Sequence, residues 1–470
     1  MVSFLLPDEP LRSVDEYVAF GGAQGLARAR ELGPEQTIQE ISLSGLRGRG
    51  GGGFPTGRKW QTVRRARGTT KYVVVNAAEG EPGTFKDRAL MRRNPYQIVE
   101  GAAIAALTMG AVRVYICLKA TFEQEIARMT EAVEEMQVAG LAGNTTMAIV
   151  TGPEEYLFGE EKAMLEVIEG NAPLPRLLPP FEHGLFAVAP QMGWQAAGAD
   201  PDAPRGRFQA QPQSNPTLVN NAETLATVPP VLAHGAEWHR AMGTAHSAGH
   251  VICTVVGDVS HAGVAEIELG MSLGEAIAQI GGGMPPGREV KAVCSGVANA
   301  VVTGAHLDAE VSHEGMQAAG SGLGSAGFIV YDDTACMVDV AHAFSRFLWV
   351  ESCGQCEACK LGSEDITAAL ERIEFGGGAD IDVQEIGARL LTVTDGNRCA
   401  LPVEEQIVIA SILRTYPEEF ADHLEGRLCE RRHDLDLPKI VDIADGVARY
   451  DEHQRFKQAD WTYAAAPSGY

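Results

Sequence analysis

The sequence lacks both an excess of positive charge and a long uninterrupted hydrophobic run. Its 470 residues include 38 Lys and Arg against 62 Asp and Glu, which gives a formal net charge of −24. Because nucleic acids and anionic lipid surfaces are themselves negative, neither is expected as a main partner. The most apolar stretch, residues 101–118, is broken by Gly110 and Arg113. It therefore predicts a buried helix followed by a strand, with no direct membrane contact.

No secretory signal is recognisable, because residues 1–10 contain two acidic side chains and lack the basic-then-apolar pattern of a signal peptide. The cysteine count is odd at nine, and four of these cysteines are clustered, which favours metal ligation over a disulfide framework. Cys117, Cys253 and Cys294 lie in apolar runs and are expected to be buried core thiols. Together these features predict a protein of the reducing cytoplasm.

A glycine-rich stretch at residues 45–60, GLRGRGGGGFPTGRKW, also carries four basic side chains and two aromatic ones. Glycines allow backbone N–H groups to approach an anion closely, so this composition predicts a phosphate cradle. The stretch lacks the Gly-Lys-Ser/Thr ending of a Walker loop and the spacing of the compact dinucleotide fingerprint. A flexible linker is the alternative, although linkers are usually rich in Ser and lack cations and aromatics.

Short β-branched runs alternate with helical patterns after this stretch. The expected strands are 71–76, 112–119 and 147–151, and the expected helices are 94–110 and 122–135. This alternation is typical of a Rossmann-like or doubly wound parallel sheet. Ligands of such sheets bind at the carboxyl ends of the strands. The segment 77–87, AAEGEPGTFKD, directly follows the first strand and is therefore expected at a binding site.

Two pairs of polar residues have both a local and a functional explanation. Glu160 and Glu161 open a helical pattern, where carboxylates complement the helix dipole. Asn220 and Asn221 precede another helical pattern, where Asn is a common N-cap. Amides also supply the donors and acceptors that a flavin ring requires. From the residues alone, the helix cap is the favoured explanation for Glu160 and Glu161, whereas both explanations of the Asn pair stay open.

Four cysteines form a C-x₂-C-x₂-C set with one distant partner: Cys353, Cys356, Cys359 and Cys399. Four thiolates around a cubane iron–sulfur cluster require this spacing, with three ligands from a tight loop and one from elsewhere in the domain. A tetrahedral zinc site is the alternative, but zinc sites usually combine two C-x₂-C knuckles. Cys429 lies outside the pattern and is expected to be inert.

The glycine-rich loop, the strand end Asn-x-x-Glu-Gly-Glu-Pro-Gly-Thr-Phe-Lys-Asp-Arg, the Gly-Glu-Glu helix start, the Asn pair and the cysteine set follow one another in a distinctive order. In this respect the chain resembles the family of flavoprotein (51 kDa, F-type) subunits of respiratory complex I. The same family supplies the diaphorase modules of NAD-linked hydrogenases and formate dehydrogenases. The resemblance covers residues 45–428. It implies an NADH dehydrogenase subunit that moves electrons between NAD(H), FMN and a [4Fe–4S] cluster in a multisubunit complex.

The resemblance also implies a division into domains. Residues 1–245 would form an α/β Rossmann-like domain for FMN and NADH, and residues 246–332 a β-grasp-like, soluble-ligand-binding domain. Residues 333–430 would form a helical bundle with the [4Fe–4S] cluster, and 431–470 a tail for which no structure is predicted. The implied partners are a [2Fe–2S] thioredoxin-like subunit and a larger iron–sulfur subunit. Through them the protein would lie peripherally at the inner face of the cell membrane.

Individual residues receive roles from the same resemblance, including a flavin role for the acidic and amide pairs. Gly48, Gly50, Gly51 and Lys59 would surround the FMN phosphate and the nicotinamide nucleotide. The flavin would be lined by Asn76, Glu79, Gly159, Glu160, Glu161, Asn220, Asn221 and Thr224. Phe54, Glu81 and Phe181 would hold NADH. The residues expected to be catalytic are Glu79, Glu81 and Glu160.

The chain departs from the family pattern at several positions. Ala78 stands where an Asp is usual, and Thr62 where a second aromatic commonly stacks on the adenine. Phe158 replaces a frequent Cys, Ala358 and Lys360 replace Pro and Arg beside a cluster cysteine, and the loop 187–215 is far longer. Ala78 and Thr62 favour an alternative function, a non-catalytic electron-transfer or scaffold subunit that keeps the cluster but not NADH oxidation.

Overall fold

The computed structural model describes residues 3–143, 145–188, 213–431 and 437–464, and the chain in it divides into two compact units. The first unit comprises Met1–Glu79, Asp87–Glu154 and Phe158–Met242, and the second comprises Gly80–Lys86, Glu155–Leu157 and Gly243–Tyr470. Most of the long loop expected at 187–215 lies outside the described residues. Within the described part of the chain, no helix is both long and apolar enough to cross a membrane.

The first unit is built on a parallel sheet with strand order β3-β2-β1-β4. Its strands are β1 (Tyr72–Asn76), β2 (Arg113–Lys119), β3 (Thr146–Gly152) and β4 (Thr217–Asn221). The strands predicted near 71–76, 112–119 and 147–151 are confirmed, whereas β4 is not predicted from the sequence. Val73, Val74 and Val75 in β1 are fully buried, as expected for a strand covered on both faces.

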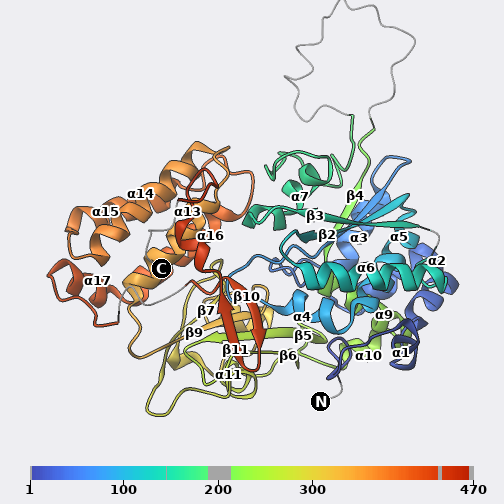
Figure 1. Ribbon diagram of the computed structural model, residues 1–470, viewed down its shortest axis with the longest axis horizontal. Coiled ribbons are helices and arrows are strands. Elements are labelled where there is room, and N and C mark those ends of the chain that lie inside the picture. The colour runs from blue at the N-terminus through green and yellow to red at the C-terminus, as the bar shows by residue number, and fades with distance from the viewer. Residues whose placement is uncertain (1–2, 144, 189–212, 432–436, 465–470) are drawn as a thin grey trace, which may run out of the picture. The chain divides into compact units, whose positions relative to one another are not determined.

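Helices cover both faces of this sheet. In this part of the chain they are α1 (Val14–Ala19), α2 (Gln24–Leu43), α3 (Thr56–Arg65), α4 (Lys86–Arg93), α5 (Pro95–Met109), α6 (Glu123–Val138), α7 (Glu161–Ile168), α9 (Ala222–His234) and α10 (Ala236–Arg240), with a 3₁₀ turn η1 (Tyr156–Gly159). Helices α5 and α9 pack against β1 and each other, and α2 packs across both (Figure 1). On the opposite face, Met164 and Leu165 of α7 join a core with Val74 and Val219.

The second unit contains a mixed sheet with strand order β6-β5-β9-β7-β8, in which only the β5–β9 pair is parallel. Its strands are β5 (His250–Gly257), β6 (Gly263–Glu268), β7 (Val290–Ser295), β8 (Val302–Thr303) and β9 (Gly327–Asp332). The helical segments beside it are α11 (Leu273–Gly281), α12 (His313–Ala318) and η2 (Gly304–His306). Leu273 and Ile277 of α11 pack into the sheet's core with Val255 and Phe328.

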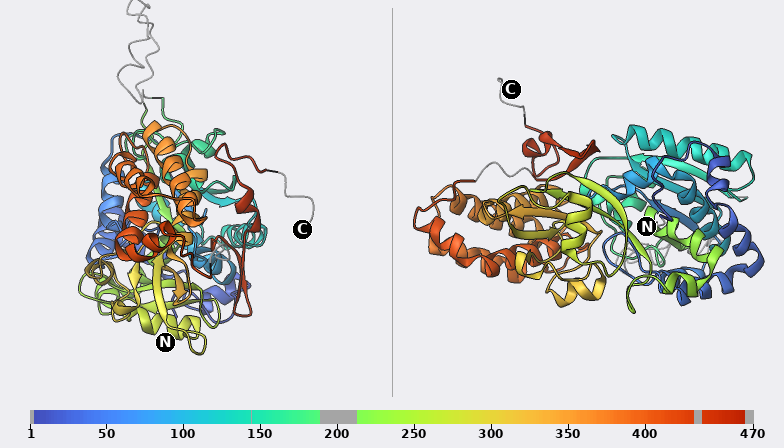
Figure 2. Two further views of the ribbon diagram at one scale, coloured as in Figure 1. Left: turned by 90° about the vertical axis from the view of Figure 1, so that its left-hand side faces the viewer. Right: turned by 90° about the horizontal axis from the view of Figure 1, so that it is seen from below.

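A helical bundle follows this sheet in the chain. Its helices are α13 (Met337–Glu351), α14 (Glu357–Glu374), α15 (Asp380–Thr392), α16 (Leu401–Thr415) and α17 (Pro417–Leu424). Helix α14 packs between α13 and α15, and α13 also packs against α16. The bundle is drawn in orange tones in Figure 2. The loop between α13 and α14 and the first turn of α14 carry three of the predicted cluster cysteines, and Cys399 lies just before α16. The bundle thus brings the four cysteines to neighbouring helix ends.

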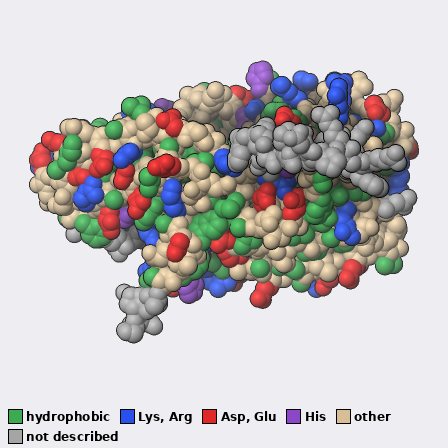
Figure 3. Space-filling view, turned by 90° about the horizontal axis from the view of Figure 1, so that it is seen from above, with side chains coloured by type: hydrophobic (Ala, Val, Ile, Leu, Met, Phe, Trp, Pro, Cys, Tyr) green, Lys and Arg blue, Asp and Glu red, His purple; other side chains and the backbone are tan. Residues whose placement is uncertain are grey.

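The tail contains a two-stranded antiparallel hairpin, β10 (Ile440–Ala444) and β11 (Val447–Tyr450), followed by a 3₁₀ turn η3 (Glu452–Phe456). Lys457 directly after this turn is fully buried. On the face drawn in Figure 3, acidic and basic side chains of the described residues are interspersed.

Candidate cofactor sites

Strand β1 of the parallel sheet lies between β2 and β4. From β1 the chain continues to β2 on one side, while β4 is added on the other, so the strand order reverses between β1 and β4. Ligands of open α/β sheets bind at such a reversal, outside the carboxyl ends of the strands. Asn76 ends β1 and Asn221 ends β4, and the two are direct partners in the parallel register. Two predicted site residues therefore lie side by side at this edge.

The glycine-rich loop closes over the same edge. Gly48 N–H donates to the Phe54 carbonyl (2.9 Å), which closes the loop on itself. Arg49 N–H donates to Thr224 Oγ1 (2.8 Å), and a Cβ placed on Gly50 would lie 3.1 Å from Asn221 Cβ. A Cβ on Gly51, where φ is +103°, would meet no atom within 4 Å. The loop is thus packed tightly on the Asn221 side and open at Gly51, an arrangement that fits a phosphate cradle.

Both amides of the Asn pair are fixed by hydrogen bonds. Asn221 Oδ1 accepts from the Glu223 and Thr224 N–H groups (3.0 and 3.4 Å) and caps α9. Its Nδ2 donates to Asp87 Oδ2 (2.7 Å). The buried Trp60 Nε1 donates to Asn220 Oδ1 (2.9 Å). The capping explanation for Asn221 is therefore confirmed, and the cap itself places the residue beside the loop.

The acidic pair is divided between a cap and an ion pair. Glu160 caps α7, because its Oε2 accepts from the Lys162 and Ala163 N–H groups (2.9 and 3.0 Å). Burial raises the pKa of Glu160 to about 7. Glu161 Oε2 lies 2.6 Å from Lys59 Nζ. The loop lysine and the start of α7 are therefore joined directly.

Two further predicted flavin residues are engaged near the end of β1. Asn76 Nδ2 donates to the Gly159 carbonyl (2.7 Å), which ties the strand end to the turn before α7. Glu79 is buried and accepts from Arg88 Nε (2.9 Å) and from the Asp87 N–H (3.0 Å). The Glu79 carboxylate thus forms a buried ion pair with Arg88.

The three residues predicted to hold NADH fall in both units. Phe54 is 49% exposed at the closing end of the glycine loop, with the Arg58 guanidinium 5.7 Å from its ring centroid. Phe181 is half-buried and follows Pro180, whose carbonyl accepts from the Thr217 N–H of β4 (2.9 Å). Glu81 belongs to the second unit, where its Oε1 accepts from the Val297 N–H (2.7 Å) and its Oε2 accepts from the Tyr156 hydroxyl.

The predicted cluster cysteines surround one hollow in the second unit. Cys353, Cys356, Cys359 and Cys399 all line it, together with Leu157, Ser352, Gly354, Arg398, Leu401 and Pro402. Burial, reinforced by Cys356 and then Cys353, raises the pKa of Cys359 to about 12. Thiols in such a place become thiolates when a cation neutralises them, so this set fits an iron–sulfur cluster.

Lys360, one of the departures from the family pattern, makes hydrogen bonds to neighbouring oxygens. Four oxygens share the three hydrogens of its Nζ: the Ser352 carbonyl (2.8 Å), the Ser352 hydroxyl (3.0 Å), the Trp349 carbonyl (3.2 Å) and the Ala459 carbonyl (2.7 Å). Burial lowers the pKa of this amine. Lys360 therefore fastens the cysteine loop to the tail.

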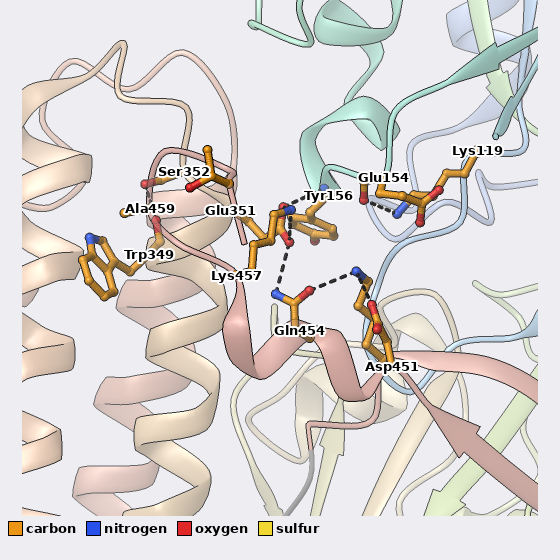
Figure 4. A network of polar contacts seen from close by, with 12 residues as sticks. Lys119, Glu154, Tyr156, Trp349, Glu351, Ser352, Asp451, Gln454, Lys457 and Ala459 are labelled. Atoms are coloured by element: carbon orange, nitrogen blue, oxygen red, sulfur yellow. Dashed lines mark hydrogen bonds and ion pairs between the residues drawn. The ribbon is translucent and has the colours of Figure 1, made fainter. Parts of the chain in front are cut away.

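A buried network that the sequence did not reveal lies beside the cysteine loop (Figure 4). Glu351 forms an ion pair with Lys457 (2.7 Å), and both side chains have no exposed area. Glu351 also accepts from the Tyr156 N–H (2.9 Å) and from Gln454 Nε2 (3.2 Å). The partners Glu351 and Lys457 are 106 residues apart, and no local spacing pattern relates them.

Three family models match the chain. The Nuo51 FMN-binding domain matches residues 41–230, the SLBB domain residues 252–294, and the NADH-ubiquinone oxidoreductase-F iron-sulfur binding region residues 339–423. The first range contains the glycine loop and both asparagines of the sheet edge, and the last contains the four cysteines that line the hollow.

Two relatives and one solved structure are similar to most of the chain. The F-type subunit 2 of the NADH-quinone oxidoreductase of Rhizobium meliloti (strain 1021) is 37% identical over 436 residues, which cover 90% of this chain and 97% of the relative. The HndC subunit of the NADP-reducing hydrogenase of Solidesulfovibrio fructosivorans is 32% identical, over 89% of this chain and 82% of its own. A chain of an NAD⁺-reducing [NiFe]-hydrogenase in the H₂-reduced state superposes with a TM-score of 0.75 at 27% identity, covering 91% of this chain and 68% of that one.

Proposed function

The chain belongs to the family of the F-type subunits of NADH-quinone oxidoreductase, and we propose that it exchanges electrons between NAD(H), FMN and a [4Fe–4S] cluster within a multisubunit complex. The observation that carries this function is the sheet edge where Asn76 and Asn221 are register partners beneath a glycine loop. FMN supplies the chemistry, since it accepts a hydride and releases electrons one at a time. The protein binds and orients the reactants.

For FMN we propose that Gly48, Gly50 and Gly51 offer backbone N–H groups to the phosphate, with Lys59 as the nearby positive charge. Lys59 is held by Glu161 and is only partly exposed, so its ammonium group has a fixed position. The remaining proposed flavin residues are Asn76, Glu79, Gly159, Glu160, Glu161, Asn220, Asn221 and Thr224. Their support is the set of hydrogen bonds that joins the loop, the two strand ends and the start of α7.

For NADH we propose Phe54 and Phe181 as stacking surfaces and Glu81 as a hydrogen-bond acceptor for the dinucleotide. The exposed ring of Phe54 is available for stacking. The catalytic residues we propose are Glu79, Glu81 and Glu160, through their charge and hydrogen bonds near the reacting rings. The four cysteines Cys353, Cys356, Cys359 and Cys399 are the proposed cluster ligands.

We propose four structural parts for these tasks: 1–245 for FMN and NADH, 246–332, the cluster bundle 333–430, and the tail 431–470. The parallel strand order supports a Rossmann-like first part. The SLBB match and the mixed sheet with α11 packed on it support a β-grasp-like second part.

The electrons must leave the cluster through other subunits. We propose a [2Fe–2S] thioredoxin-like subunit and a larger iron–sulfur subunit as partners, in a respiratory complex or a soluble NAD-linked hydrogenase or formate dehydrogenase. Relatives named for both quinone reduction and hydrogenase activity support the two contexts. We further propose a cytoplasmic location, attached to the inner face of the membrane only through partners.

The test is an anaerobic NADH titration of the purified complex, followed by flavin absorbance and then by the EPR signal of the reduced cluster. We expect the flavin to bleach first and the cluster signal to follow. A Cys353→Ser variant should lose the iron and the EPR signal of this cluster, whereas Cys294→Ser, which alters a buried thiol of β7, should keep both. A flavin that is absent or unmoved by NADH, with a cluster that dithionite still reduces, would identify a non-catalytic conduit instead.

A further inference from the structure

Three potential metal ligands lie together in the second unit at positions that the proposed electron path does not use. Cys336 precedes α13, His423 lies in the last turn of α17, and Cys429 follows α17. The two sulfur atoms and a ring nitrogen lie within 4.8 Å of one another. Cys336 and His423 are fully buried, and Cys429 is half-buried. Two thiols and an imidazole in one buried place are a ligand set suited to zinc.

The hydrogen bonds of His423 fix which ring nitrogen can bind a cation. Nδ1 lies 3.3 Å from the Ile373 carbonyl, and a carbonyl can only accept a hydrogen bond, so Nδ1 carries the hydrogen. Nε2 then carries the lone pair, and Cys336 Sγ lies 3.5 Å from it. Metal-binding histidines typically donate their second N–H to a backbone carbonyl in this way. The Cys429 N–H, 3.2 Å from Nε2, is the hydrogen bond that a bound cation would replace.

The separation of the ligand atoms matches tetrahedral zinc. Bond lengths of about 2.3 Å to sulfur and about 2.0–2.1 Å to nitrogen place the two ligand atoms about 3.5 Å apart at a tetrahedral angle. The observed distance from Cys336 Sγ to His423 Nε2 is 3.5 Å. The two atoms therefore already stand at the separation that a shared ion requires.

A carboxylate stands beside this set, although its oxygens are not among the atoms that lie within 4.8 Å of one another. Glu419 Oε2 lies 4.0 Å from Cys429 Sγ and accepts from the Met337 N–H (2.9 Å). The other oxygen, Oε1, lies 2.7 Å from Lys291 Nζ. Lys291 and the Met337 N–H thus fix the Glu419 carboxylate, and Oε2 is the oxygen that lies 4.0 Å from Cys429 Sγ.

We propose that Cys336, His423 and Cys429 bind a zinc ion, to which a small movement of Glu419 would add the fourth ligand. The ion would join the start of α13, the end of α17 and the segment that leads to the tail, so its role is structural. It would lie apart from the four cysteines of the iron–sulfur cluster and would take no part in electron transfer. The proposal gives Cys429 a function that its isolation in the sequence did not suggest.

The test uses the complex purified anaerobically with its cluster intact. Elemental analysis should find about one zinc ion per chain beside the cluster iron, and zinc K-edge absorption should show sulfur neighbours at about 2.3 Å together with nitrogen or oxygen. A Cys429→Ser variant should lose most of the zinc and keep its iron. Cys253→Ser, which alters a buried thiol of β5 outside the proposed site, should keep both metals.

Three results would overturn the proposal. The first is wild-type protein that contains its iron but no zinc. The second is a Cys336–Cys429 disulfide, recognised in non-reducing mass spectrometry by the loss of two hydrogens. The third is zinc that remains bound at the wild-type level in Cys429→Ser. If this variant fails to fold and loses both metals, the K-edge spectrum of the wild type decides, and a spectrum without sulfur neighbours contradicts the site.

Discussion

The Tyr156 hydroxyl oxygen lies 3.2 Å from Glu404 Oε2 while its single hydrogen is donated to Glu81. One hydroxyl hydrogen cannot serve two carboxylates at once, so one of the two carboxyl groups must carry a proton. Burial, followed by the charge of Glu81, raises the pKa of Glu404 to about 8. Glu404 is therefore held as a neutral acid at neutral pH, next to a residue proposed to bind NADH.

Glu404→Gln should make the protein more stable than the wild type at alkaline pH. The folded-state pKa of about 8 exceeds the ordinary 4.5, so the folded protein binds a proton that the unfolded chain lacks between these values. The stabilising contribution is complete below about pH 4.5 and is lost as the pH rises toward 8. The amide imitates the protonated acid at every pH. We expect a melting temperature several degrees above wild type at pH 9 by calorimetry, because each kcal/mol of stability raises it by about 2–4 °C in a domain of about 150–250 residues.

The advantage of Glu404→Gln over the wild type should shrink steadily as the pH is lowered from 9 to 5. Glu364→Gln, at a position outside this network, is the matched control and should show no such trend. A constant offset between variant and wild type at all pH values would show that Glu404 is ionised in the folded protein.

Glu81→Gln should raise the apparent KM for NADH severalfold while FMN and iron contents stay unchanged. The amide oxygen can still accept from the Val297 N–H and its NH₂ group can face Tyr156, so the fold is preserved. The negative charge and one acceptor position for the dinucleotide are lost. Steady-state kinetics with an artificial electron acceptor gives the measurement, and unchanged kinetics would remove Glu81 from the NADH site.

Lys457→Met should be strongly destabilising, although it alters a residue of the tail. The change leaves the fully buried Glu351 without its cation, and breaking a buried ion pair costs about 3–5 kcal/mol. Urea unfolding followed by tryptophan fluorescence measures the loss. The control is Arg28→Met, which breaks an exposed pair with Glu31 and should cost about 0–1 kcal/mol. Equal losses of unfolding free energy in the two variants would mean that the buried Glu351–Lys457 pair stabilises the protein no more than an exposed pair does.

Gly50→Ala should weaken FMN binding by about tenfold, a loss of about 1.4 kcal/mol. The new Cβ would lie 3.1 Å from Asn221 Cβ, which is close enough to displace the side chain at the end of β4. Fluorescence titration of the deflavinated protein with FMN measures the affinity. Gly52→Ala is the control in the same loop, because its Cβ would meet no protein atom within 4 Å. Equal losses in both variants would show that the Asn221 contact is not the cause.

Patterns within a short segment predicted the structure well, whereas contacts across the sequence were not predictable. The β-branched runs predicted β1, β2 and β3, and cysteine spacing predicted which four thiols share a hollow. Strand β4 was not predicted because Thr217–Asn221 runs directly into the cap of α9, so its Asn pair indicated only the start of a helix. The Glu351–Lys457 pair escaped for a different reason: a buried charge in the sequence looks the same as an exposed one until its partner is known.

The bond from Lys360 to Ala459 has a consequence for the order of events during synthesis. The two residues are 99 positions apart, and at about 5–20 residues per second a ribosome needs about 5–20 s to make that length of chain. Throughout this interval the cysteine loop exists without the tail that later holds it. Every new chain therefore passes through a period in which its cluster ligands are complete but the tail has not yet been fastened to them.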